Sequence, residues 1–104
     1  MADPMKIRAQ LRGEIAEIKV LMAHPMETGL RKDSISGELV PIHFIKNVLA
    51  THNNRIVLQA QWSQAVSKNP FLHFRVRGAK PGDRIVVSWE DSRNDTAMIE
   101  AILN

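Results

Sequence analysis

The sequence has 104 residues, of which 44% are hydrophobic and 24% are charged, and its formal net charge is +3. This length suits one domain with one apolar core, which we expect residues 1–104 to form. Because the chain has no cysteine, disulfides, thiolate metal sites and a cysteine nucleophile are excluded.

Apolar and polar residues alternate with a period of two along much of the chain, which is typical of strands that bury one face. The expected strands, in chain order, cover residues 5–12, 18–22, 41–51, 56–62, 72–77, 85–90 and 96–102. Turn residues separate them, and no segment has convincing helical periodicity. About seven antiparallel strands predict an all-β fold, a single immunoglobulin-like β-sandwich, with Trp62 and Trp89 in its core.

The hairpin around Asn53 and Asn54 admits two registers. A two-residue loop pairs Ala50 with Val57, whereas a three-residue loop pairs Ala50 with Leu58. We prefer the second register because it leaves polar side chains on the solvent face, and a slip of one residue inverts every side chain.

The preferred register also leaves some apolar residues pointing outward, and the residue after Pro70 is out of phase with its strand. The outward-pointing apolar residues are Ile45, Leu49, Val57 and Phe71. If they are contiguous, they indicate a protein interface.

Four histidines, at positions 24, 43, 52 and 73, raise the question of a metal site. No two have the i, i+2 or i, i+4 spacing of a local ligand pair, so we expect surface or turn histidines, although convergence from separate strands stays open. The carboxylates lie mostly at turns, and no nucleophile-elbow or phosphate-loop motif occurs. We therefore expect no metal and no cofactor.

Acidic and basic residues are interspersed and aromatic residues make up only 5% of the chain, which argues against nucleic-acid binding. No apolar run approaches the roughly 20 residues of a membrane span. Residues 1–8 also lack the apolar segment of a signal peptide, which taken alone indicates the cytoplasm.

Two blocks of sequence resemble a known family. They are H-P-M-E-T-G-L-R-K-D at residues 24–33 and A-Q-W-S-Q-A-V-S-K-N-P-F-L-H-F-R-V-R-G-A-K-P-G-D at residues 60–83. In this order they closely resemble the Z subunit of the thiosulfate-oxidising (Sox) sulfur carrier, the SoxZ family. The P-I-H-F-I-K segment at residues 41–46 and the His52-Asn53-Asn54 turn also fit, so the resemblance covers nearly the whole chain.

The resemblance implies a non-catalytic subunit of a heterodimeric sulfur carrier in thiosulfate oxidation. Such a subunit scaffolds a Y subunit, which carries the sulfur on a cysteine, and docks the other Sox pathway enzymes. It also implies a periplasmic location, reached by export together with a Y subunit that has a twin-arginine signal. Without the partner, we expect the same surface to support a homodimer, because a symmetric pairing needs only one self-complementary patch. The competing hypothesis is an immunoglobulin-like binding or adhesion module without a sulfur role.

The block at residues 24–33 has two interpretations, a solvated loop or a docking loop. In the second, its mixed charges orient a partner more than they add affinity. The loop residues that we assign to the partner interface are His24, Met26, Glu27, Arg31 and Lys32, together with the four outward-pointing apolar residues.

Overall fold

The computed structural model describes residues 5–104, and all its regular elements in that range are strands. They are β1 (Met5–Arg12), β2 (Ile15–Met22), β3 (Ile45–His52), β4 (Arg55–Gln61), β5 (Phe71–Arg77), β6 (Arg84–Asp91) and β7 (Thr96–Ile102). This confirms the all-β class. The first four residues of the expected domain lie outside the described range. Within residues 5–104 no helix is long and apolar enough to cross a membrane.

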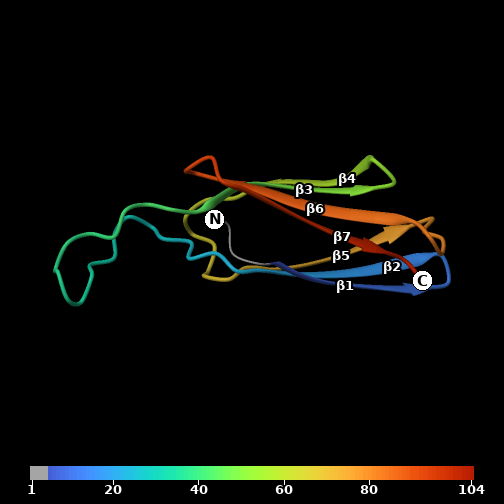
Figure 1. Cartoon of the computed structure of the whole chain (residues 1–104), viewed down its shortest axis with the longest axis horizontal. Coiled ribbons are helices and arrows are strands. Elements are labelled where there is room, and N and C mark those ends of the chain that lie inside the picture. Colours follow the sequence, from blue (N-terminus) through green and yellow to red (C-terminus); the bar gives the residue numbers. More distant parts are fainter. Residues whose placement is uncertain (1–4) are drawn as a thin grey trace.

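The strands form two antiparallel sheets packed face to face, with orders β1-β2-β5 and β4-β3-β6-β7 (Figure 1). Alternate residues of both sheets point inward, as the period of two predicts. The buried core includes Ile18, Val20, Met22, Val48, Ile85, Val87 and Trp89. Trp62 is only partly buried, but it packs against this core as expected. The fold is therefore the β-sandwich that the sequence predicts.

The body of the β3–β4 hairpin has the preferred register, with Ala50 opposite Leu58. Beyond Ala50 the pairing shifts by one residue at a β-bulge, so that His52 lies opposite Arg55 and the loop holds only two residues. The bulge thus supplies the extra residue that a three-residue loop was expected to supply. Both loop asparagines have positive φ, of 50° and 69°, which matches a tight hairpin turn.

The prediction that Ile45 points outward is wrong, because its side chain is fully buried in the core. The pairing of β3 with β6 shifts between Ile45 and Asn47, and this irregularity turns Ile45 from the outer face to the inner one. The other three outward-pointing residues keep their expected side. Leu49 is half-buried on the outer face, Val57 is 39% exposed and Phe71 is 60% exposed.

Candidate functional site

A long irregular segment, residues 25–44, projects beyond one end of the sandwich (Figure 1). We call it the arm. Its two limbs are paired at isolated bridges, Glu27 with His43 and Lys32 with Leu39. Backbone N–H groups of Glu27 and His43 donate to each other's carbonyls at 2.6 and 3.0 Å. The predicted docking loop, residues 24–33, is thus the root and first limb of a hydrogen-bonded ribbon.

The tip of the arm has a defined shape although it contacts no core. The Asp33 carboxylate accepts hydrogen bonds from the backbone N–H groups of Ile35 and Ser36, at 2.8 and 3.0 Å. Hydrogen bonds from Ser36 and Ile35 lower the pKa of this carboxyl. Gly37 then closes the turn with a φ of 73°, which favours glycine.

Large apolar side chains are exposed along the arm. Their exposed fractions are 82% for Leu30, 96% for Ile35, 57% for Leu39 and 45% for Ile42. Sequence reasoning missed all four, because the irregular arm has no strand or helix period from which exposure is read. Such a row of apolar groups on a projecting ribbon is typical of a protein-binding element.

The charged residues assigned to the interface differ in their availability. Arg31 donates two hydrogen bonds to the Glu27 carboxylate, at 3.0 and 2.6 Å, and this contact lowers the pKa of Glu27. Lys32 is exposed. By contrast, His24 and Met26 are buried, with 3% and 5% exposed, so they lie beneath the surface that they were expected to form.

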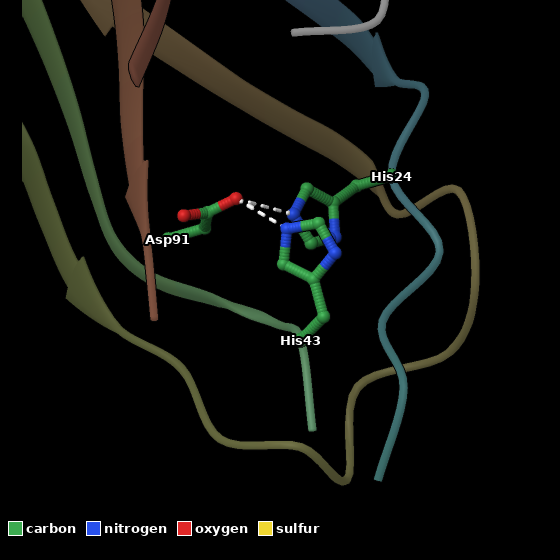
Figure 2. A group of neighbouring side chains, drawn as sticks. All are labelled: His24, His43 and Asp91. Atoms are coloured by element: carbon green, nitrogen blue, oxygen red, sulfur yellow. Dashed lines mark hydrogen bonds and ion pairs between the residues drawn. The ribbon is translucent and has the colours of Figure 1, made fainter. Parts of the chain in front are cut away.

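The root of the arm is held by three polar side chains that converge from separate elements (Figure 2). The Asp91 Oδ2 atom, at the end of β6, lies 3.0 Å from His24 Nε2 and 2.7 Å from His43 Nε2. His24 follows β2 and His43 precedes β3, so the two histidines sit at the two ends of the arm. We call His24, His43 and Asp91 the clasp, because together they close the root of the arm.

The hydrogen bonds around His24 fix its tautomer. The Met26 backbone N–H donates to His24 Nδ1 at 3.1 Å, so Nδ1 carries the lone pair. The ring proton is then on Nε2, which donates it to Asp91. His24 also contacts the Trp89 ring edge to face, with centroids 5.1 Å apart.

The Asp91 carboxylate is saturated with hydrogen bonds. Its Oδ1 atom accepts from the backbone N–H groups of Arg93 and Asp95, at 2.9 and 3.0 Å, and Oδ2 accepts from both imidazoles. Burial raises the pKa of Asp91, but the hydrogen bonds from the histidines and the two backbone groups outweigh burial and lower it to about 2. Asp91 is therefore a buried, fully satisfied carboxylate.

The ligand atoms of the clasp lie within 4.8 Å of one another, which is close enough for them to hold one metal ion. A cation there needs the lone pair of His24 Nε2. Met26 N–H places the proton on that nitrogen, and Asp91 already accepts four hydrogen bonds. The geometry therefore favours a structural role. Local spacing gave no signal for the clasp, since Asp91 lies 67 and 48 residues from its partners.

Asn69 joins the two sequence blocks at the root of the arm. Its Oδ1 atom accepts from the His24 backbone N–H at 3.1 Å, and its own N–H donates to the His24 carbonyl at 2.9 Å. Asn69 has a φ of 53° rather than the extended conformation expected before Pro70, because the two bonds to His24 hold it there.

The outer face of the four-stranded sheet offers a second apolar surface. A shallow hollow of about 550 Å³ is lined in part by Asn47, Leu49, Ser88 and Met98. Ser88 lies between Leu49 and Met98 in the register, and Met98 is 69% exposed. Asn47 lies near the start of β3, so the hollow is at the end of the sandwich from which the arm projects.

A β-sandwich with exposed apolar groups on a preformed arm and on the outer faces of its sheets is typical of a protein-interaction subunit. Residues 5–101 match the family described as sulphur oxidation protein SoxZ. The chain therefore belongs to the SoxZ family, and its role lies in the Sox sulfur-oxidation system. No curated protein matches the sequence.

Proposed function

We propose that this chain is the non-catalytic subunit of a heterodimeric sulfur carrier in thiosulfate oxidation. It holds a Y subunit that bears the carrier cysteine, and it presents the pair to the enzymes of the pathway. The absence of cysteine supports this division, because a sulfur intermediate carried on a thiol must then be on the partner. The pair works in the periplasm, which this chain reaches together with its partner.

The exposed apolar side chains of the arm are the observation that supports this proposal. A side chain such as Ile35, with 96% of its surface exposed, is stabilised when a partner removes it from water. The clasp and the paired limbs hold the arm in shape before binding. Such preorganisation lowers the conformational entropy that binding must overcome.

The arm alone is narrow, so we place the neighbouring hollow around Leu49 and Met98 in the same interface. A stable heterodimer buries at least about 1,000 Å² in total, with an apolar centre and a polar rim. Arg31 and Glu27, which already bind each other, and Lys32 then belong to the rim and contribute orientation.

Co-expression with a Y-like subunit of the Sox system tests this function. The variant Ile35→Asp/Leu39→Asp should keep the circular dichroism and thermal midpoint of the parent, because both side chains are exposed. It should weaken binding at least ~tenfold, as expected for charge at an apolar anchor.

Ser34→Asp is the matched control, because it adds a charge at another exposed position of the arm tip and should leave binding unchanged. Retention of the partner by the double variant would move the interface off the arm. Failure of the unmodified chain to bind the Y-like subunit would overturn the proposed function itself.

A further inference from the structure

The outer face of the three-stranded sheet carries six of the fourteen Lys and Arg residues of the chain and has a strong excess of positive charge. Its cations are Lys6, Arg8, Arg12, Lys19, Arg75 and Arg77, and its one carboxylate is Glu17. We call this surface the basic face. Its formal charge is +5 against +3 for the whole sequence, so the rest of the chain is net negative. The charges are interspersed in the sequence, and the period of two sorts them onto one face.

The register places two cations directly opposite one another. Arg8 lies across from Lys19. Like charges at opposed positions destabilise a sheet. The arrangement therefore does not serve the stability of the isolated chain, which points to a ligand that neutralises it.

Glu17 compensates only part of this charge. Its carboxylate lies 3.7 Å from Lys19 and 3.6 Å from both His73 and Arg75, so one anion is shared among three partners. Desolvation raises the pKa of Glu17, but the field of Lys19, His73, Arg12 and Arg75 outweighs it and lowers the pKa. Shallow hollows of about 490 and about 210 Å³ lie on either side of this carboxylate, lined in part by Arg8 and by Arg75.

Apolar residues at the ends of the basic face identify the kind of ligand. Leu21 and Phe71 lie opposite each other across β2 and β5, with 40% and 60% of their surface exposed. Ile15, at the other end, is 42% exposed. Protein interfaces combine apolar contacts with charge in this way. Single-stranded nucleic acid needs several stacking aromatics, and of the residues on this face only Phe71 is a Phe or Trp.

We propose that the basic face docks an acidic protein surface, with Leu21 and Phe71 as its apolar contact. This inference rests on the proposed function, since a carrier must be presented to the enzymes that load and process its sulfur. The basic face is on the outer side of the β1-β2-β5 sheet, and the hollow around Met98 is on the outer side of the β4-β3-β6-β7 sheet. Figure 1 shows these two sheets packed face to face. One partner can therefore stay bound while an acidic enzyme is exchanged.

Electrostatic docking of this kind accelerates association and is screened by salt. The test uses the purified heterodimer, immobilised and exposed in turn to each of the other Sox pathway enzymes. Association rates are measured from about 25 mM to about 300 mM salt. At least one enzyme should bind with a rate that falls steeply as salt rises.

The charge-reversal variant is Arg8→Glu/Arg77→Glu, because neither arginine forms an ion pair within residues 5–104. It should slow association with that enzyme at least ~tenfold at low salt and flatten the salt dependence. Lys80→Glu/Arg93→Glu makes the same change in net charge at exposed turn positions and should change the rate by less than about twofold.

Equal losses of association rate in the two variants would mean that only the net charge matters. An unchanged rate in Arg8→Glu/Arg77→Glu would mean that the basic face is not the docking surface. Either result overturns the inference. Tighter binding of a ~20-nucleotide single strand than of any enzyme would assign the face to nucleic acid instead. Co-purification of the Y-like subunit is scored in every sample. It should persist in both variants, so its loss in the parent would count against the proposed function rather than against this surface.

Discussion

His24 Nε2 lies 3.0 Å from Asp91 Oδ2 although 67 residues separate them in the chain. Both side chains are buried, with 3% and 1% exposed. His24 stands at the root of the arm and Asp91 ends β6, so this hydrogen bond ties the projecting element to the four-stranded sheet. Because its root is fixed, the arm holds its apolar surface in one orientation, which favours the binding of the proposed partner.

We expect Asp91→Asn to lower the free energy of unfolding by about 3–5 kcal/mol, since it removes the charge from a buried hydrogen-bonded cluster. The amide also turns one acceptor into a donor facing an imidazole N–H. Denaturant unfolding measures the loss, and hydrogen exchange should show faster exchange in residues 25–44. Asp95→Asn makes the same charge change at an exposed side chain and should have little effect; an equal loss there would contradict the clasp.

Stability should fall in acid. Hydrogen bonds from His52 and Asn53 lower the pKa of Asp83 to about 2, and the clasp lowers that of Asp91 to about 2, from a usual 3.8. Carboxyls with a depressed pKa in the folded state stabilise it above their unfolded pKa, and that stabilisation is lost as the pH falls from about 4 to about 2. Urea unfolding at a series of pH values checks this, and a flat profile across that window would contradict it.

Zinc should not stabilise the protein. Because Met26 N–H holds the proton of His24 on Nε2, a metal at the clasp must first displace that proton or break the Met26 bond. Elemental analysis of the purified protein should find no stoichiometric metal. A thermal scan with excess zinc should leave the midpoint unchanged, whereas a rise that scales with zinc concentration would show that the clasp binds the ion in the folded state.

A charge inserted on the inner face of β3 should destabilise the protein far more than one inserted on its outer face. Ile45→Asp places a carboxylate in the core, where Ile45 is fully buried, and should cost more than about 4 kcal/mol. Leu49→Asp lies on the outer face between Gln59 and Ser88 and should cost about 1 kcal/mol or less. Thermal unfolding of both variants measures these two losses. An Ile45→Asp protein as stable as the parent would contradict the burial of Ile45 by the bulge near Lys46.

The isolated chain should form no covalent sulfur adduct, because it contains no thiol. Incubation with thiosulfate and an oxidant, followed by intact mass spectrometry, should return the unmodified mass. The same treatment of the heterodimer should modify the Y-like subunit alone. A stoichiometric adduct on this chain would contradict its assignment as the non-carrier subunit.

The sequence by itself determined the number and order of the strands, because the period of two depends only on which residues face the core. It did not determine every boundary, since residues 41–44, which were expected to begin a strand, belong to the arm. The sequence also determined the register of the β3–β4 hairpin, where only one pairing leaves polar residues such as Gln59 outside, and the exposure of Phe71. The same alternation predicts which charged residues share the basic face. A count of charges along the chain does not show this face, because residues such as Lys6 and Glu17 are separated in sequence but lie on one surface of the sheet.

Only the tertiary structure decided the rest. The bulge that buries Ile45 is an irregularity in the pairing of β3 with β6. The local alternation of residues does not reveal it, because it depends on the partner strand. The clasp joins positions 24, 43 and 91, which meet only when β2, β3 and β6 end at the same edge of the sandwich. Hydrogen bonds at the clasp and along the limbs hold the arm in its projecting position. The side chains of Ile35 and its apolar neighbours on the arm are therefore exposed, because the position of the arm does not depend on their burial.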